Sequence, residues 1–401
     1  MTPAGMSAPL EGLRVVELSG YVATPLCGMT LAQLGADVVR VEPIGGQADR
    51  SRWPLGPSGT SLYWTGLNKG KRAVEVDFRS DEGRAVIADL VERRGVVVAN
   101  ADLPGLSYEK LRERRKDLIH ALLTGRRDGG TAVDYTVNAE TGLPAVTGPA
   151  GEAGPVNHVL PAWDIAAGLY LATGLLAAER HRLLTGEGRR ITVALRDVAL
   201  SMVANLGYLA DAQLGGEPRT KDGNHFYGGY GRDFRTADGR RVMLVVLTSR
   251  HWSDLLALTG LTAAVEAVER ALGADFRRDS DRYAHRAVIG GLLEPWFAGR
   301  PFAEVDAALS ARRLLYAPYR TFEELATDPG ALLAGNPVLG MLDQPGVGPH
   351  LSAGSPVVVD GEQGPPRPAP SVGQHTGEVL REELGYSAAR LAALRDQGAI
   401  G

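Results

Sequence analysis

A carboxylate stands at the start of the most apolar stretch of the sequence, NHVLPAWDIAAGLYLATGLLAAERHRLLTGEG, which begins at Asn157. The apolar run follows Pro161, and Asp164 is the acid at its beginning. This position is typical of a helix cap, because an aspartate oxygen accepts free backbone N–H groups and its charge suits the positive end of the helix dipole. The same field keeps a carboxylate ionised and ready to act as a nucleophile, so both roles are open.

Two cationic loops next to predicted strands have the charge to bind an anion. NKGKR places Lys69, Lys71 and Arg72 just before a strand, and GRRDGG places Arg126 and Arg127 directly after one. Cations at strand ends are typical of sites for phosphorylated ligands. Solvated charge on an exposed loop is the alternative for each of them.

A third feature is the glycine-rich stretch HFYGGYGRD, which sets Gly228, Gly229 and Gly231 between aromatic residues. An ordinary turn is one interpretation. The other is a mobile lid whose backbone N–H groups approach a ligand, since glycine adopts conformations that other residues avoid.

Several common sites are excluded by their missing motifs. The loop SGYVATPLCG after the first strand lacks G-x-G-x-x-G, so a dinucleotide fingerprint is not formed. The sequence also contains no P-loop, no H-E-x-x-H and no G-x-S-x-G. We therefore expect no metal site, and the single Cys27 reads as a small buried residue rather than a nucleophile.

Composition narrows the class of protein further. A chain of 401 residues can bury a large core, and its 22% charged residues with a net charge of −4 give no basic footprint for nucleic acid. The start, MTPAGMSAPLEGL, lacks a secretory signal, and the most apolar segment, around 165–178, is too short to span a bilayer. With one cysteine, the chain is expected to be cytoplasmic, without nucleic-acid or membrane partners.

The elements that position these residues alternate in type. LRVVEL, ADVVRVE, RAVEVDF, VVVAN, LIHALLTG and RRITVAL read as strands, and helical periods stand between them. This alternation predicts an α/β fold with a parallel sheet covered on both faces. From about residue 222 the pattern changes to a hairpin, FRTADGRRVMLVVL, followed by helices, which predicts a second, smaller domain over 222–325.

Taken together, these segments resemble the class III CoA-transferase family. The likeness is carried by PLEGLRVVEL, LAQLGADVVRVEP, NKGKRAVEVDF, VVVAN, YAPYRTFEEL and VGQHTGEVL, and so covers nearly the whole chain. It implies a Rossmann-like large domain built from both chain ends, residues 1–221 and 326–401, with a smaller α+β domain over 222–325. It also implies a homodimer of two interlocked subunits.

The resemblance assigns roles to single residues. Asp164 in PAWDIAAG matches the catalytic aspartate, and the small residues Ala166, Ala167 and Gly168 are expected to leave room for an acyl group. The three glycines at 228, 229 and 231 match a loop that shields the reactive intermediate from water.

The CoA-binding residues follow from the same resemblance. Tyr21, Val22 and Ala23 would line the path of the adenine and pantetheine, Lys71 and Arg72 would meet phosphates, and Asn100 would contact pantetheine or diphosphate. Our own inference adds Arg126 and Arg127 as cations for a free substrate carboxylate, because arginine pairs with carboxylates through two hydrogen bonds.

The implied activity is transfer of CoA between carboxyl groups through a covalent aspartyl intermediate, with CoA as part of the substrate and no other cofactor. GLNKGKR, GRRDGGTAVDYTVN, VNHVLPAWDI and YGGYGRDF favour the branch that moves CoA within one C5 unsaturated dicarboxylic acid, that is, mesaconyl-CoA. Transfer between two separate acids and non-catalytic acyl-CoA binding are the alternatives. Racemase activity is disfavoured, because Val133 stands where that branch carries a histidine, and His158 is expected to be bonded within a loop instead.

Overall fold

The computed structural model describes residues 8–215, 217–327, 330 and 336–401, so the first seven residues of the stretch expected to lack a signal lie outside it. The chain divides into two compact units. The first comprises the chain up to Thr141, His158–Gly216 and Gly330–Gly401, and the second comprises Gly142–Asn157 and Glu217–Pro329. Both chain ends thus contribute to the first unit, and the second also takes in residues 142–157, which the sequence analysis had left in the large domain.

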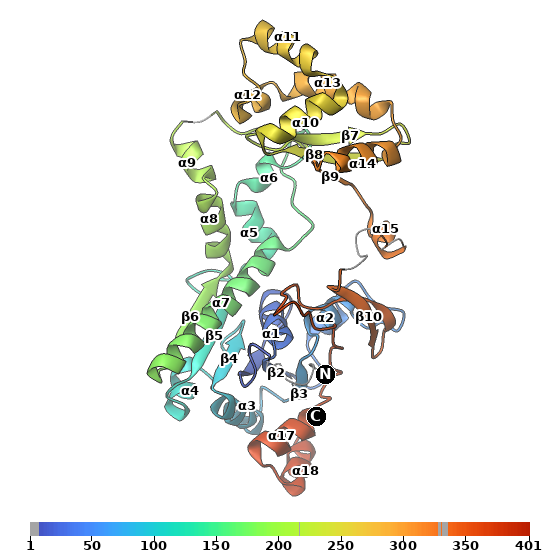
Figure 1. The fold of residues 1–401 in the computed structure, drawn as a ribbon. Helices are drawn as coiled ribbons and strands as arrows, with labels where there is room; N and C mark the ends of the chain where they lie inside the picture. Colours follow the sequence, from blue (N-terminus) through green and yellow to red (C-terminus); the bar gives the residue numbers. More distant parts are fainter. Residues whose placement is uncertain (1–7, 216, 328–329, 331–335) are drawn as a thin grey trace. The chain divides into compact units, whose positions relative to one another are not determined.

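A six-stranded parallel sheet forms the centre of the first unit (Figure 1). The strands stand in the order β3-β2-β1-β4-β5-β6, which is the order of a doubly wound Rossmann-like sheet. Their bounds are β1 Arg14–Leu18, β2 Asp37–Glu42, β3 Arg72–Glu75, β4 Val96–Ala99, β5 Ile119–Thr124 and β6 Arg190–Ala194. The strand order reverses between β1 and β4, and in such sheets ligands bind beside the carboxyl ends of the strands at that reversal.

Two hydrophobic cores cover the two faces of this sheet, because side chains alternate along each strand. Val15 and Val38 belong to the core beneath α1 (Ala23–Gln33) and α7 (Ala162–Thr185). Their neighbours Val16 and Val39 belong to the opposite core. That core is completed by α3 (Asp81–Arg94) and, from the end of the chain, by α17 (Thr376–Leu384) and α18 (Ala388–Asp396) (Figure 1).

The remaining elements of the first unit are short. They are η1 Ala48–Ser51, α2 Leu62–Leu67, α4 Tyr108–Arg114, α5 Asp134–Glu140, α8 Leu195–Asn205, α9 Tyr208–Gln213, and the hairpin strands β10 Leu339–Gln344 and β11 Gly348–Ala353. Gly207, with a φ of 84°, separates α8 from α9. The β10–β11 hairpin was not predicted from the sequence.

The second unit has its own antiparallel sheet, in the order β7-β8-β9, and its own core. The expected hairpin is confirmed by the pairing of β7 (Tyr230–Arg235) with β8 (Arg241–Val246). The ring of Phe234 stacks on that of Phe297 with centroids 4.2 Å apart. The other elements are α6 Leu143–Val146, α10 Ser249–Thr259, α11 Thr262–Leu272, α12 Asp279–Ala284, α13 Arg286–Ala298, α14 Phe302–Ala311, β9 Leu315–Pro318 and α15 Phe322–Thr327.

Within the described residues, no helix has both the length and the apolar character needed to cross a membrane.

The second turn of α7 packs backbone against backbone on the first residue of α1. A Cβ placed on Gly168 of α7 would lie 2.5 Å from the carbonyl oxygen of Ala23 in α1. The space beside Gly168 is therefore filled by α1, which corrects the expectation that this glycine leaves room for an acyl group. The close packing brings the first turn of α7 against the loop between β1 and α1.

Replacing this glycine tests the packing directly. We expect Gly168→Ala to lower the free energy of unfolding by about 1–3 kcal/mol, because the added methyl group meets a backbone oxygen that cannot rotate away. Gly291→Ala is the matched control, since Gly291 also lies in a helix but a Cβ there meets no atom within 4 Å. Alanine at that position should be neutral or stabilising by about 0.5–1 kcal/mol. Equal urea-unfolding curves for both variants would contradict this account.

Candidate active site

The amino end of α7 is capped by a side chain from another helix. Pro161 stands at the N-cap and provides no side-chain hydrogen bond. The free N–H groups of Trp163 and Asp164 instead donate to Oδ2 of Asp134, at 2.7 and 3.2 Å. Asp134 is the first residue of α5 and is 2% exposed. The capping role considered for Asp164 is therefore taken by Asp134.

Two further hydrogen bonds hold Asp134 and α7 in place. Nε2 of His158 lies 3.0 Å from the second oxygen of Asp134, which confirms that this histidine is bonded within a loop. The indole N–H of Trp163 donates to the side-chain oxygen of Asn138 at 3.0 Å. Together these contacts join the start of α5 to the start of α7.

With its capping role taken over, the carboxyl group of Asp164 stands in the first helical turn beside a second carboxylate. Burial raises the pKa of Asp164 to about 6, the charge of Asp134 adds to the rise, and Arg52 opposes it. At neutral pH Asp164 is thus mostly ionised, and it is more basic than an ordinary aspartate. A partly buried, more basic carboxylate is a better nucleophile than an exposed one, because less water must be removed before it attacks.

The loop between β1 and α1 lies at the strand-order reversal, where the sequence analysis placed CoA. Tyr21 has a left-handed backbone, with a φ of 66°, and its N–H donates to the Asp49 carboxylate at 2.8 Å. Asn100, directly after β4, donates from its side chain to the carbonyl of Gly20 at 3.0 Å. The structure therefore brings these predicted residues together. Tyr21 is 53% exposed, whereas the side chains of Val22 and Ala23 are buried.

A cavity of about 390 Å³ opens beside this loop, at the carboxyl edge of the sheet. Asn100 lines it together with Leu18 at the end of β1 and Gln47 and Ala48 from the segment after β2. Its position beside β1, β2 and β4 is the one that doubly wound sheets use for ligands.

A buried ion-pair network supports the same edge from within. Arg40, which is fully buried, pairs with Glu17 at 3.2 Å, Glu42 at 3.3 Å and Asp49 at 3.1 Å. Asp49 in turn holds the N–H of Tyr21, so the network fixes the backbone of the loop. Removing one member of such a network leaves a buried charge without a partner, which is strongly destabilising.

Lys71 belongs to this network rather than to a ligand site. Its ammonium donates at 2.8 Å to Glu17, to the side chain of Asn68 and to the carbonyl of Pro25. An ammonium has three donors, so Lys71 keeps none for the phosphate predicted as its partner. Burial lowers its pKa to about 8, against the raising effect of Glu17.

Arg72 lies apart from the other predicted CoA contacts. It is the first residue of β3, at the amino edge of the sheet, and it pairs with Asp37 and Glu383 at 2.6 Å each. The structure therefore does not bring Arg72 together with Tyr21 and Asn100, which lie at the carboxyl edge.

The remaining predicted residues have other surroundings. Arg126 pairs with Glu140 at 2.8 Å, and Arg127, 87% exposed, pairs with Asp197 at 2.7 Å.

The predicted glycine loop lies in the other unit. Gly228 has a φ of 76° and lies in a turn, whereas Gly231 is already part of β7. All three glycines belong to the second unit and Asp164 to the first. Their shielding role stays a prediction.

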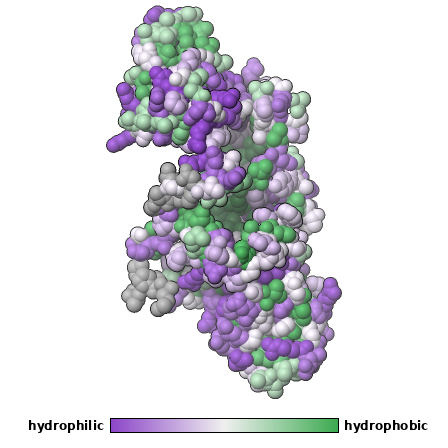
Figure 2. Space-filling model, turned by 90° about the vertical axis from the view of Figure 1, so that its right-hand side faces the viewer, coloured by the Kyte–Doolittle hydropathy of each residue, from purple (hydrophilic) through white to green (hydrophobic). Residues whose placement is uncertain are grey.

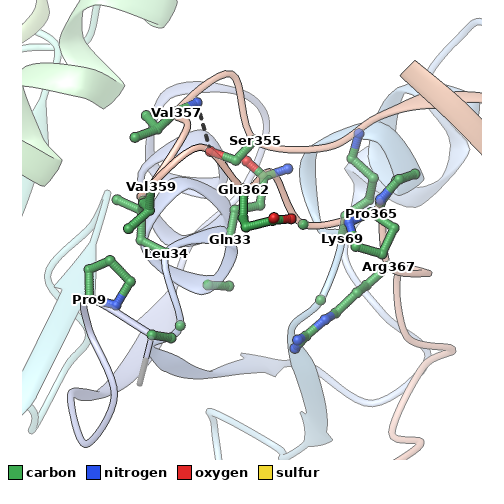
Figure 3. A pocket seen from close by; sticks show the side chains of 16 residues that line it. Pro9, Gln33, Leu34, Lys69, Ser355, Val357, Val359, Glu362, Pro365 and Arg367 are labelled. Carbon is green, nitrogen blue, oxygen red and sulfur yellow. Dashed lines mark hydrogen bonds between the residues drawn. The ribbon is translucent and has the colours of Figure 1, made fainter. Parts of the chain in front are cut away.

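Another cavity, of about 170 Å³, lies between the end of α1 and residues 355–367 (Figure 3). Lys69, Glu362 and Arg367 line it, but none of the residues predicted to bind CoA does. The Lys69 ammonium donates to Oγ of Ser352 at 3.3 Å and to the carbonyl of Ala353 at 2.5 Å. Among the described residues, no group of three or more His, Cys, Asp or Glu could hold a metal ion.

Two residues that act on the pKa of Asp164, namely Asp134 and Arg52, were not predicted from the sequence. Asp134 lies in the segment GRRDGGTAVDYTVN, and the sequence marks it only as an aspartate that can begin a helix. Arg52 had no local signal, because only the folded chain brings it near α7.

The raised pKa of Asp164 predicts that its ionisation lowers the stability of the folded protein. Its pKa is about 6 in the folded protein against 3.8 ordinarily, so ionisation is easier after unfolding and charging this group costs stability. We expect Asp164→Asn to raise the free energy of unfolding by about 1–2 kcal/mol at neutral pH, less than the full shift because the group is partly solvated. The gain should be constant above pH 6, shrink from pH 6 to 4 and vanish below.

Chemical denaturation as a function of pH measures this difference. Glu152→Gln, in an exposed loop, is the control for the loss of one negative charge. A stability difference between Asp164→Asn and the parent protein that does not change between pH 4 and 7 would show that Asp164 has no raised pKa.

Comparisons with known proteins identify the family of the chain. A model of CoA-transferase family III matches residues 10–376. The 2-methylfumaryl-CoA isomerase of Chloroflexus aurantiacus is 48% identical over 98% of each chain. A succinyl-CoA:mesaconate CoA-transferase of Haloarcula hispanica is 32% identical over 93% of this chain and 96% of its own. The crystal structure of a CAIB/BAIF family protein from Brucella suis has a TM-score of 0.76 at 26% identity, covering 94% of this chain and 100% of that one. The chain therefore belongs to CoA-transferase family III.

Proposed function

We propose that this protein moves CoA between C1 and C4 of one 2-methylfumaryl-CoA molecule, through a covalent intermediate on Asp164. The observation that carries the proposal is the carboxyl group of Asp164, raised in pKa to about 6 in the first turn of α7. It stands beside the loop at the strand-order reversal, where a nucleotide-containing substrate is expected.

The proposed chemistry needs only carboxylates and the thioester. The Asp164 carboxylate attacks the thioester carbonyl at C1, and the C–S bond breaks to give a mixed anhydride and the CoA thiolate. The thiolate attacks the aspartyl carbonyl, so the anhydride bond breaks, CoA becomes a thioester of Asp164, and the dicarboxylate stays bound to the enzyme without a covalent bond. The C4 carboxylate then attacks this thioester, and the same two steps run in reverse. No proton is consumed, and CoA enters only as part of the substrate.

The choice of an intramolecular reaction rests on the relatives. The relative that is 48% identical is named an isomerase of 2-methylfumaryl-CoA, which favours transfer within one molecule. The relative that is 32% identical is named a transferase between succinyl-CoA and mesaconate, so transfer between two acids is the second candidate. For racemisation, Val133 still stands where a base is needed, and its side chain is 61% exposed.

We also propose that two copies of the chain form a homodimer, interlocked as the family resemblance implies. Large apolar side chains are exposed in the first unit along α7, α8 and α9, and α9 has no buried residue. They are Leu169, Tyr170, Leu183, Leu184, Leu206, Leu209 and Leu214. Figure 2 shows that hydrophobic residues remain exposed among polar ones on the face it presents. Exposed apolar surface of this extent is typical of protein interfaces.

One assay separates the two candidate reactions. We expect the protein to convert 2-methylfumaryl-CoA with CoA on C1 into the isomer with CoA on C4, without any acceptor acid, as followed by chromatography. With isotope-labelled free 2-methylfumarate in excess, the product should stay unlabelled, because the dicarboxylate does not leave during the reaction. Asp164→Ala is the control and should show no conversion. Product that forms only with added acid, or that carries the label, would select transfer between two molecules.

A further inference from the structure

Arg52 is held by its backbone in a fixed place next to the proposed active site. Its N–H donates to the carbonyl of Asp49 at 3.2 Å, and its carbonyl accepts the hydroxyl of Ser61 at 2.6 Å. Ser61 also caps α2, and the carboxylate of Asp49 belongs to the buried network around Arg40. The position of Arg52 therefore depends on the same framework that fixes the loop of Tyr21.

The side chain of Arg52 lies against two tyrosine rings. Its guanidinium carbon is 4.7 Å from the ring centre of Tyr63 and 5.9 Å from that of Tyr21. Contact with aromatic rings orients the planar guanidinium, and five N–H donors are more than one tyrosine hydroxyl can accept.

Packing brings this guanidinium to the loop that contacts the helix of Asp164. Arg52 lies against the ring of Tyr21, and Ala23, two residues further along, packs its backbone against Gly168 of α7. The electrostatic effects agree with this placement. Burial raises the pKa of Tyr63, the Arg52 guanidinium opposes that rise, and the Asp164 carboxylate adds to it. Arg52 is also the cation that opposes the raised pKa of Asp164. The three side chains are therefore near enough to act on one another.

Arg52 differs from the other arginines near this edge of the sheet in having no acid as its partner. Among the described residues, no carboxylate oxygen lies within 4 Å of its guanidinium. Acids pair with each of the others, namely Arg40, Arg50, Arg126 and Arg127. Its side chain is also exposed, so a ligand can reach it.

We propose that Arg52 binds the free carboxylate of a dicarboxylyl-CoA substrate while Asp164 attacks the thioester end. This inference rests on the proposed function and deepens it, because it assigns the residue that selects a dicarboxylate over a monocarboxylate. It replaces the assignment of that role to Arg126 and Arg127, whose guanidinium groups already pair with Glu140 and Asp197.

Binding by Arg52 explains how the dicarboxylate stays on the enzyme while CoA is transferred within one molecule. After CoA has moved to Asp164, the substrate is a free dicarboxylate with two negative charges. A guanidinium can hold one carboxylate through two hydrogen bonds while the other faces the aspartyl thioester. When the two ends exchange roles, the same cation serves the second carboxylate. Arg52 is thus a specificity-determining residue, and the bonds that form and break remain those on Asp164.

The test compares two thioesters that differ in one group. The first is 2-methylfumaryl-CoA, and the second is 2-methylbut-2-enoyl-CoA, in which a methyl group replaces the free carboxylate. Formation of the Asp164 adduct is measured with both, by trapping with hydroxylamine and mass spectrometry. The variants are Arg52→Gln, which removes the charge, and Arg52→Lys, which keeps it without the planar fork. Arg93→Gln, an exposed arginine at the end of α3, is the matched control.

We expect Arg52→Gln to slow adduct formation with 2-methylfumaryl-CoA roughly tenfold or more, as for the loss of a charge-assisted hydrogen bond. The rate with the methyl analogue should stay as in the parent protein. Arg52→Lys should lie between the two, and Arg93→Gln should match the parent with both substrates. Arg52→Gln should also release more free dicarboxylic acid per turnover, which a merely structural role would not cause.

Two results would overturn the proposal while leaving the proposed function intact. One is an Arg52→Gln variant that reacts with 2-methylfumaryl-CoA as fast as the parent. The other is an equal loss with both thioesters in a folded variant, which would place Arg52 in CoA binding or in structure. If the parent protein forms no Asp164 adduct with either thioester, the proposed function itself fails, and this inference fails with it.

Discussion

The candidate site depends on which of two carboxylates accepts the free backbone N–H groups at the amino end of α7. Asp134 accepts the N–H groups of Trp163 and Asp164 and is itself bonded to His158. Asp164 is left in the same turn, partly buried and next to that negative charge, and its pKa rises to about 6. The carboxylate of Asp164 is therefore more basic than an ordinary aspartate, at a cost in stability that proteins commonly accept at functional sites.

The rest of the first unit positions the proposed CoA-binding loop beside the first turn of α7. Gly168 lets α7 approach the backbone of α1, and α1 begins at the loop where β1 meets the strand-order reversal. The buried charges around Arg40 hold the same loop through Asp49. These supports act on neighbouring residues, Ala23 and Tyr21, so packing and buried ion pairs fix the backbone of the loop that we propose binds CoA.

Sequence patterns predicted the parts of this arrangement that are local. Runs of valine in VVVAN and LRVVEL, with helical periods between the predicted strands, were enough to foresee the parallel sheet. The proposed nucleophile, Asp164, was identified through PAWDIAAG. The role of each charged side chain could not be predicted, because it depends on partners that are distant in sequence. Lys71 resembled a phosphate ligand until the fold placed Glu17 and Asn68 around it, and Arg52 has no motif at all.

Covalent capture of Asp164 is the most direct measurement of the central claim. The protein is incubated with 2-methylfumaryl-CoA and hydroxylamine, which attacks activated carboxyl groups but not free carboxylates, and the tryptic peptide containing PAWDIAAG is weighed and sequenced by mass spectrometry. The account predicts an aspartyl hydroxamate at Asp164 that forms only with the thioester present. An unmodified peptide under turnover conditions, or a hydroxamate at Asp134 or Glu140 instead, would contradict it.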